Sequence, residues 1–431
     1  MSLTEILLPA IVILVALAVL NVPLYLAILM AAMYITFSLN LSLEGMFSGL
    51  FNNIAKTSFL CIPFFLLTGT LIQASSLGIR LINLFMVLLQ HTAAGLAIAC
   101  LFANAVFGAI SGSSPAAVAT FGRVIYGPLA RVQGEKLSLG IITSSGALST
   151  IIPPSIMLIV FGIATDTSIT RLFMAGILPG VVLVIIVATY LQWRCTKNNK
   201  MGLYEGEIKP KATMGELKDV AGKAIPVLFL PVIILGGIYC GLFTPTEAAA
   251  VSSIYSLVIA VFVLKDIDLK ALPKVLIDTC RVTGQTFLLV ASSTLFAQSL
   301  TIAQVPGMIT EGFSSFEKIT FLLMLNVLLL VIGCFFDTAA AILILAPLLM
   351  PAALALGIDP VHLGIVFTVN LSIGMFTPPF GMNIFVAQSI LEKSMGQIAR
   401  AVVPYIGLYI IGLIVITYIP QISLILPRVL F

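Results

Sequence analysis

The chain has 431 residues, of which 60% are hydrophobic and only 9% are charged, and its mean hydropathy is +1.19. A chain this apolar needs lipid as its solvent, and its composition leaves no room for a sizeable soluble domain. The formal net charge of +4 is small and the basic residues fall mainly between apolar runs, which argues against nucleic acid as a partner.

Cysteine and histidine usage argues against a redox or transition-metal centre. The six cysteines are scattered through apolar runs, without the spacing of a zinc site or a disulfide framework. We interpret them as small core residues. With only His91 and His362, a multi-histidine haem or copper centre is hard to build, and both side chains are expected to pack or to lie at the interface.

The N-terminal part predicts two membrane spans followed by a helix in the membrane interface. Met1 to Leu20 lacks the basic region and cleavage site of a secretory signal, so it is expected to be a retained first span. Asn21 and Pro23 break this span, and Leu24 to Phe37 completes a tight helical hairpin. From Leu43 to Lys56 the apolar residues recur at helical spacing among polar ones, which is typical of a helix lying along the interface.

A serine and glycine segment interrupts the next apolar sequence. It follows the apolar runs Ser58 to Ala74 and Ile82 to Leu89 and a third run that begins at Ala94. We predict that Ser111 to Ser114 forms the tip of a re-entrant hairpin, since small residues allow a sharp turn and Pro115 suits the first turn of the departing helix. The alternative is close helix packing through small residues.

The segment Ser144 to Pro154 is an apolar run that ends in two consecutive prolines. Because proline cannot donate a backbone hydrogen bond, a helix that reaches Pro153 must break. A break at membrane depth is tolerated only where the freed backbone groups are buried in protein or line a wet cavity. The break is therefore predicted to mark a functional site.

The second half of the chain repeats the first at an offset of 225 positions. Pro153 and Pro154 correspond to Pro378 and Pro379. The repeat also pairs other positions: Gly112 with Asp337, Ser113 with Thr338, Ser145 with Asn370, Gln73 with Gln298, and Lys56 with Arg281. Leu264 to Asp278 is expected to replace the first interfacial helix.

The repeat divides the chain into three parts. Residues 1–193 form the first repeat, 194–223 a polar linker that is expected to be cytoplasmic, and 224–431 the second repeat. The linker carries seven basic residues against four acidic ones. An odd number of crossings in each repeat would make the repeats inverted, the layout of many secondary transporters, whose sites lie at discontinuous helices near the midplane. The sequence thus predicts an all-α polytopic membrane protein that acts as a secondary transporter.

Each repeat then supplies one hairpin tip and one broken helix, whose carbonyls and hydroxyls are hard oxygen ligands suited to sodium. The first predicted sodium site comprises Ser111, Gly112, Ser113, Gly146, Ser149 and the carbonyls around Ile152 and Pro153. The second comprises Asp337, Thr338, Asn370, Gly374, Thr377 and nearby carbonyls such as that of Pro378. Between the tips, helix ends favour an anion, and its predicted ligands are Ser114, Ser145, Asn370 and Asn383.

Three carboxylates lie in or beside apolar sequence, where a charge is costly enough to suggest function. Asp337 occupies a tip and is our candidate for cation ligand or coupling group. Glu247 follows Pro245 at a helix start, where a carboxylate caps the helix. Asp166 is interpreted as a loop or cap residue. Lys56 and Arg281 are interpreted as snorkelling anchors.

Four segments together resemble the large membrane subunit of tripartite ATP-independent periplasmic (TRAP) transporters. These segments are Gly108 to Thr120, Gly146 to Ser155, Thr244 to Ala250 and Phe376 to Asn383. The resemblance covers essentially the whole chain. It implies an elevator-type fold in a bacterial inner membrane, in which a mobile domain built from both hairpins and broken helices moves against a scaffold.

The same resemblance implies sodium-coupled import of an organic acid, of the sialic acid or C4-dicarboxylate type. A soluble periplasmic binding protein would deliver the substrate, and a small membrane subunit, here a separate chain, would bind the scaffold. The alternative is a stand-alone ion-coupled anion transporter that needs no binding protein. A channel is a further alternative. The sequence contains no constellation of nucleophile and base that would suggest an enzyme, and no Walker motif that would suggest an ATP-driven pump.

Overall fold

The computed structural model describes residues 3–20, 22–201, 210–313 and 315–430. Within these ranges all regular structure is helical. Six of the described helices are long and apolar enough to cross a membrane, or up to eight if each of two bent pairs counts as one span. The prediction of an all-α polytopic fold is thereby confirmed.

The first half of the chain contains eleven α-helices and one short 3₁₀ helix. They are α1 (Leu3–Val19), α2 (Leu24–Ser38), α3 (Leu43–Ile54), η1 (Thr57–Leu60), α4 (Cys61–Gln73), α5 (Leu77–Leu89), α6 (Gly95–Ser111), α7 (Ser114–Gln133), α8 (Glu135–Ser145), α9 (Leu148–Ile151), α10 (Ile156–Ala164) and α11 (Ile169–Lys200).

The second half continues with eleven more α-helices, two of which are extended by a π-helical turn. They are α12 (Met214–Pro231), η2 (Val232–Gly236), α13 (Gly237–Tyr239), α14 (Pro245–Val258), η3 (Ile259–Val263), α15 (Leu272–Ile302), α16 (Val305–Phe313), α17 (Lys318–Gly333), α18 (Thr338–Ala355), α19 (Pro360–Gly374), α20 (Met382–Leu391), α21 (Met395–Tyr418) and α22 (Gln421–Leu430).

The order of these helices repeats once along the chain. At an offset of 225 positions, α6 and α7 correspond to α17 and α18, α8 with α9 corresponds to α19, α10 to α20, and α11 to α21. Glu135, the first residue of α8, falls on Pro360, the first residue of α19. Agreement over so many element boundaries supports the duplication that the proline pairs suggested.

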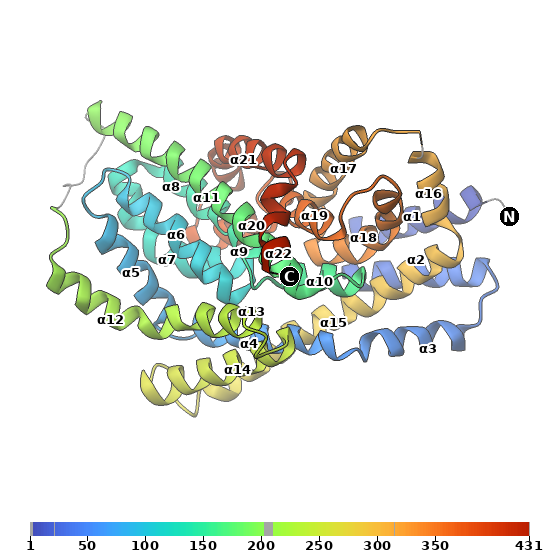
Figure 1. Ribbon diagram of the computed structural model, residues 1–431, viewed down its shortest axis with the longest axis horizontal. Coiled ribbons are helices and arrows are strands. Elements are labelled where there is room, and N and C mark those ends of the chain that lie inside the picture. The colour runs from blue at the N-terminus through green and yellow to red at the C-terminus, as the bar shows by residue number, and fades with distance from the viewer. Residues whose placement is uncertain (1–2, 21, 202–209, 314, 431) are drawn as a thin grey trace.

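Packing between the halves is reciprocal. Helix α4 packs against α14 while α15 packs against α2, and α7 packs against α20 while α18 packs against α10. An exchange in which each half offers the same two surfaces to the other is the mark of a two-fold relation. In Figure 1, α3, α4, α12, α14 and α15 run along the lower edge, and the hairpins and broken helices lie above them.

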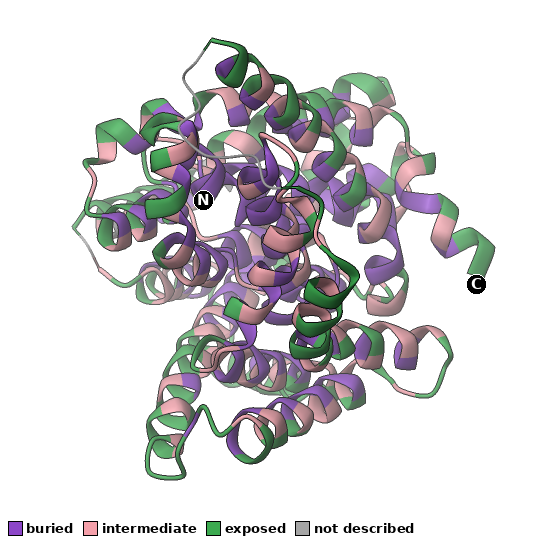
Figure 2. Ribbon diagram, turned by 90° about the vertical axis from the view of Figure 1, so that its left-hand side faces the viewer, coloured by how far each residue is buried: buried purple, intermediate pink, exposed green. Residues whose placement is uncertain are grey.

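The inner arm of the first hairpin, α6, and the broken helices α8–α9 and α19 are largely buried. In α19 every residue from Val361 to Gly374 is buried, and Figure 2 shows buried residues concentrated in the interior. A helix that is covered all round belongs inside the protein. Large apolar side chains are exposed instead on the outer helices, for example Val12 on α1 and Val327 on α17, as contact with lipid requires.

One expected correspondence is wrong. The sequence predicted that Leu264 to Asp278 replaces the interfacial helix, but helix α15 starts at Leu272 and runs unbroken to Ile302. In the first half the matching stretch is divided into α3 and η1–α4, which are bent by 60°. The polar residues in this part of α15 do not interrupt its backbone hydrogen bonds, so they do not force a separate helix.

The predicted linker is partly helical in the described residues. Helix α11 continues to Lys200 and α12 begins at Met214, where Thr213 and Glu216 form a capping box. In such a box each side chain accepts a hydrogen bond from the other residue's backbone N–H, which fixes the helix start. Most of residues 202–213 lie outside the described residues, so the linker's extent is not tested further.

Candidate functional site

The first hairpin turns within two residues. Helix α6 ends at Ser111 and α7 begins at Ser114. Gly112 adopts φ +59° and its N–H donates to the Gly108 carbonyl at 2.9 Å. Glycine adopts this left-handed conformation without the strain that a Cβ brings. The tight turn and the place of Pro115 in the first turn of α7 agree with the prediction.

The second hairpin turns more widely, because α17 ends at Gly333 and α18 begins at Thr338. Asp337 immediately precedes α18 with an ordinary φ of −60°, and its Oδ1 accepts from the N–H groups of Ala339 and Ala340 at 2.9 and 3.3 Å. A carboxylate at this position caps the helix and interacts favourably with the partial positive charge at the helix N-terminus. Asp337 therefore has a structural role besides the predicted one.

Both broken helices end at their proline pairs. Helix α9 stops at Ile151 and α10 begins at Ile156, with Ser155 as its cap. Helix α19 stops at Gly374 and α20 begins at Met382. Both proline pairs are joined by cis peptide bonds. Thr150 and Ser372, one from each repeat, are fully buried and share a hydrogen bond of 2.6 Å between their hydroxyl oxygens.

Each hairpin crosses its own broken helix at the same pair of repeat positions. A Cβ added to Gly108 would lie 2.1 Å from the Cα of Ser149. At the equivalent crossing a Cβ on Gly374 would lie 2.3 Å from the carbonyl carbon of Gly333. Real Cβ atoms never approach so closely, so the glycines permit backbone contact. These crossings place Ser149 and Gly374, two predicted sodium ligands, directly against the hairpins.

The two tips meet at one cavity of about 320 Å³. The first tip contributes Gly112, Ser113 and Ser114, and the second contributes Asp337 and Ala339. The lining includes four pairs that the 225-residue offset relates: Gly112 with Asp337, Ser114 with Ala339, Thr150 with Met375, and Met157 with Met382. The cavity thus lies between the repeats, and α4 and α15 also line it.

Four helices begin at this cavity. Its lining includes Ser114 at the start of α7, Ile156 at the start of α10, and Met382 at the start of α20. The fourth helix is α18, whose second residue, Ala339, also lines the cavity. The N–H groups of a first helical turn have no partner within the helix and carry a partial positive charge. Their convergence makes the cavity suited to an anion.

A buried hydrogen-bond group holds the first tip to the second repeat. Asn383 donates to the Ser114 hydroxyl at 2.8 Å and to the Thr143 carbonyl at 3.1 Å. Ser114 in turn donates to Asn383 Oδ1 at 3.0 Å. Both side chains are fully buried. Asn383 therefore acts on the cavity through Ser114, which lines it.

Of the four predicted anion ligands only Ser114 lines the cavity, and besides Asn383 neither Ser145 nor Asn370 is among the lining residues. Ser145 is buried against α6, with its hydroxyl 3.9 Å from the Cys100 sulfur. Asn370 donates to Asn326 of α17 at 2.8 Å and to the Val366 carbonyl at 2.8 Å. Its Oδ1 is buried without a hydrogen-bond partner. The predicted roles of both residues require the helices to shift before an anion reaches them.

A second, smaller cavity of about 90 Å³ adjoins the Asp337 tip. Its lining includes Asp337 and Thr338, both predicted sodium ligands, together with Gly333 and Phe380. The Thr338 hydroxyl is buried and has no hydrogen-bond partner. A carboxylate and an unpaired hydroxyl at one small cavity are oxygen donors of the kind a hard cation binds. Among the described residues no cluster of three or more histidine, cysteine, aspartate or glutamate side chains exists.

The remaining predicted sodium ligands line neither cavity. The Ser149 hydroxyl donates to the Asn104 carbonyl at 3.3 Å, and the Thr377 hydroxyl donates to the Ile373 carbonyl at 2.7 Å. A Cβ on Gly146 would meet Val118 at 2.6 Å. The other predicted ligands lie at the first tip or at the two breaks: Ser111, Ile152, Pro153 and Pro378.

Several lining residues were not predicted. Met157 and Met382 form a repeat-related pair, and the 225-residue offset could have identified them. Gln285 and Thr286 of α15 also line the cavity, and their polarity within an apolar span was the available signal. Asn104, which lines neither cavity, carried the same signal as a polar residue within an apolar run. Its carbonyl accepts from Ser149, and its Oδ1 is buried without a hydrogen-bond partner.

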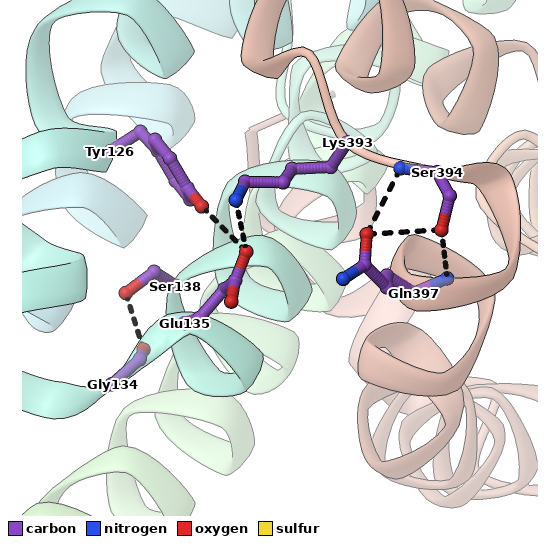
Figure 3. A network of polar contacts seen from close by, with 7 residues as sticks. All are labelled: Tyr126, Gly134, Glu135, Ser138, Lys393, Ser394 and Gln397. Atoms are coloured by element: carbon purple, nitrogen blue, oxygen red, sulfur yellow. Dashed lines mark hydrogen bonds and ion pairs between the residues drawn. The ribbon is translucent and has the colours of Figure 1, made fainter.

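The two halves are also joined by an ion pair away from the cavity. Lys393, in the loop between α20 and α21, lies 2.6 Å from Glu135 at the start of α8. Tyr126 of α7 donates to the same carboxylate at 3.1 Å, and Figure 3 shows all three side chains converging. The hydrogen bond to Glu135 raises the pKa of Lys393 above its ordinary value, so this lysine is charged at neutral pH.

Residues 9–422 match the family described as "Tripartite ATP-independent periplasmic transporter, DctM component". The C4-dicarboxylate TRAP transporter large permease protein DctM of Pseudomonas aeruginosa is 41% identical over 384 residues, which cover 88% of each chain. The sialic acid TRAP transporter large permease protein SiaM of Vibrio cholerae is 33% identical over 393 residues, which cover 90% of each chain.

A solved structure shares the fold. The Alcanivorax borkumensis YdaH transporter, whose topology is described as unusual, superposes with a TM-score of 0.62 over 87% of this chain and 88% of its own. The sequence identity is 16%. At this identity the likeness concerns the arrangement of helices.

Proposed function

The chain belongs to the DctM component family of tripartite ATP-independent periplasmic transporters, and we propose that it imports an organic acid anion by sodium symport. It is a large permease subunit and a multi-pass membrane protein by family and fold. The proposed substrates are a C4-dicarboxylate or a sialic acid, which the names of similar permeases specify.

The observation that carries the proposal is the convergence of four helix starts on one cavity between the repeats. A carboxylate placed there meets the positive ends of α7, α10 and α20, and no lysine or arginine is among the described residues that line the cavity. Helix N-termini of this kind bind anions with backbone N–H groups, as in transporters with discontinuous helices. Ser113 also lines the cavity and can donate its hydroxyl, whereas Ser114 and Thr150 line it with hydroxyls that are already bonded to Asn383 and Ser372.

Asp337 supplies the reason for coupling to a cation. Its carboxylate lines the same cavity, so in its charged form it repels an anionic substrate. A sodium ion held by Asp337 and Thr338 would cancel this repulsion and leave the helix ends to attract the anion. Sodium then raises substrate affinity, and substrate raises sodium affinity by the same factor.

The proposed first sodium site lies at the other hairpin. Ser111, Ser113 and Ser149 supply hydroxyls there, and the unpaired Asn104 Oδ1 adds a donor of suitable chemistry. Its ligands are neutral, so it would bind the cation less strongly than the site that contains Asp337. The two sites are proposed to fill in sequence, with the Asp337 site first.

Movement is proposed to follow an elevator mechanism in which both hairpins and both broken helices travel together. Joint movement is supported by two features of the hairpins and broken helices. They share the cavity, and they pack tightly on one another through Gly108 and Gly374. The scaffold would consist of α1 to α4 and α12 to α15. Helix α15 lines the cavity through Gln285 and Thr286, so it lies where a moving group would slide.

Two partners are proposed on family grounds. A periplasmic binding protein would deliver the anion, and a separate small membrane subunit would bind the scaffold. The assembly would reside in a bacterial inner membrane. Exposed apolar side chains on the scaffold helices, such as Phe262 and Val263 of η3, are open to lipid or to such a subunit.

The test is uptake into proteoliposomes that contain this chain and the small subunit, with the binding protein added. We expect uptake of a radiolabelled C4-dicarboxylate or sialic acid only with an inward sodium gradient and only with the binding protein present. Uptake that ignores the sodium gradient would refute symport. Uptake without the binding protein would favour the stand-alone transporter instead.

A further inference from the structure

A large groove runs along the outer face of the first repeat, well away from the central cavity. It has a volume of about 870 Å³ and lies between α11 and the α5–α6 pair. Its lining consists of Leu89, Thr92, Ile98, Phe102, Ala188, Thr189, Gln192, Trp193, Thr196, Lys197 and Lys200. A groove of this size lies within the range of ligand sites.

The character of the groove changes along its length. One end is apolar, with Ile98 and Phe102 of α6 facing Ala188 of α11. The side chains of α11 then become polar and basic, ending in Lys197 and Lys200 in its last turn. Residues three and four apart share a helix face, so this succession forms one stripe. The gradient matches a molecule with an apolar tail and a negatively charged head.

Among the residues that the structure describes, the basic end has no acidic counterpart in the lining. Among the described residues no salt bridge involves Lys197 or Lys200. The Lys197 ammonium lies 5.5 Å from the centre of the Trp193 ring, and the tryptophan is 58% exposed. Tryptophan and lysine are typical of the level of lipid headgroups, and anionic lipids attract lysine at a membrane surface.

From these observations we propose that the groove binds one anionic phospholipid of the cytoplasmic leaflet. Its phosphate would lie between Lys197 and Lys200, with the glycerol region at Trp193 and Gln192 and an acyl chain along Phe102 and Ala188. The cytoplasmic side follows from the basic segment that begins at Arg194. A simpler account is that the lysines only complement the negative end of the α11 dipole, and that account gives no selectivity among lipids.

Trp193 makes the proposal directly testable, because it is the single tryptophan of the chain. The full chain is reconstituted in phosphatidylcholine that contains a small fraction of brominated lipid, which quenches tryptophan on contact. We expect brominated phosphatidylglycerol to quench with an apparent association constant about 25-fold above that of brominated phosphatidylcholine, at roughly fivefold for each lysine. The preference should decrease with salt.

Two variants and a matched control separate the contributions. Lys197→Gln with Lys200→Gln should bring the preference close to unity. Ala188→Phe should reduce quenching by both lipids, because the added ring occupies the acyl part of the groove. Lys218→Gln with Lys223→Gln removes the same charge from α12 outside the groove and should leave the preference unchanged. Melting temperatures of all variants verify that they fold.

Equal quenching by the two brominated lipids would overturn the proposal, as would a preference that survives removal of Lys197 and Lys200. Absence of quenching by either lipid would also overturn it, since the groove would then be closed to lipid. The measurement needs no substrate, sodium or partner, so its outcome is independent of the transport function proposed above.

Discussion

The two hairpin tips occupy equivalent positions in the repeat and yet differ in backbone, charge and surroundings. The first turns in two residues through Gly112 at φ +59°, whereas the second takes four residues and ends in Asp337. Position 112 cannot readily hold a side chain, because a Cβ would lie 3.0 Å from Ile156. The duplicated frame therefore offers a place for a carboxylate at one tip only.

Their surroundings differ as well. Helix α6 is buried along nearly its whole length, covered by α5, α11 and α12. Helix α17 is buried on one face only and exposes Ile319, Leu323 and Val327. The second tip is thus the one that carries a charge, and the helix that leads to it is less buried than its counterpart at the first tip. A site that binds and releases a cation in each cycle is easier to build there, because low packing permits motion.

The largest expected effect concerns the charge at Asp337. Asp337→Asn removes the charge but keeps an oxygen to accept from Ala339 and Ala340, so the melting temperature should stay near that of the wild type. Sodium stimulation of uptake should fall about 10- to 100-fold, because this is the loss of affinity expected when one charged ligand is removed. Proteoliposome uptake across a sodium series measures this.

Asp337→Ala is the companion variant. It removes the helix cap as well, and should cost about 1 kcal/mol of stability in addition to the coupling defect. Normal sodium stimulation in Asp337→Asn would mean that the carboxylate is only a helix cap, and that the two tips do not differ in cation binding.

The second prediction tests the two crossings. Gly108→Ala places a Cβ against the backbone of Ser149 and should destabilise the protein by about 1–3 kcal/mol, since a backbone cannot move aside as a side chain does. Gly333→Ala is the equivalent change, but its nearest neighbour is the Gly374 Cα at 3.2 Å, and its cost should be smaller. Melting temperatures in detergent compare them.

Gly127→Ala is the control, because no atom lies within 4 Å of a Cβ at this helical position. It should stabilise slightly, as glycine is a poor helix former. If the melting temperatures of Gly108→Ala and Gly333→Ala equalled that of this control, the close crossings would not contribute to the rigidity of the hairpins.

The third prediction makes the first tip more like the second. Ser114→Ala introduces the residue that stands at position 339, and leaves Asn383 with only part of its buried hydrogen bonds. We expect a loss of about 1–2 kcal/mol and weaker substrate binding. Equilibrium binding of the radiolabelled anion and thermal melting measure the two effects.

Ser253→Ala serves as the reference, since that hydroxyl bonds only to the Ala250 carbonyl of its own helix. Should Ser114→Ala behave like Ser253→Ala in both measurements, the link between the first tip and α20 would have no part in shaping the cavity.

The smallest effect is expected at the ion pair of Glu135 and Lys393. Both side chains are partly exposed, at 44% and 33%, and exposed pairs contribute about 0.2–1 kcal/mol. A double-mutant cycle with Glu135→Gln and Lys393→Gln should give a coupling in that range, decreasing with salt. A coupling above about 2 kcal/mol would indicate that this contact locks the halves together.

Much of the site was predictable because proline and glycine act locally. The proline pairs located both broken helices, and Pro115 with Gly112 located the first tip, since these residues restrict the backbone wherever they occur. The capping role of Glu247 was predictable for the same reason and is confirmed by its bonds to Thr244, each 2.8 Å long.

The continuity of α15 was not predictable, because an interfacial helix and the first turns of a long span have the same amphipathic pattern. The direction in which a buried side chain points was equally out of reach. Ser145 and Asn383 are both small polar residues near a break, yet one faces Cys100 of α6 and the other holds Ser114. Helical spacing does not tell which neighbour a helix will meet.

By itself, the sequence determined that the chain is a duplicated, helical membrane protein with two interrupted segments, because composition, repeat offset and proline positions are read without knowing any contact. Only the tertiary structure decided that both tips and four helix starts share one cavity. That meeting depends on the reciprocal packing of α7 with α20 and of α10 with α18. Contacts between residues more than two hundred positions apart follow from how whole surfaces fit, and no local pattern records them.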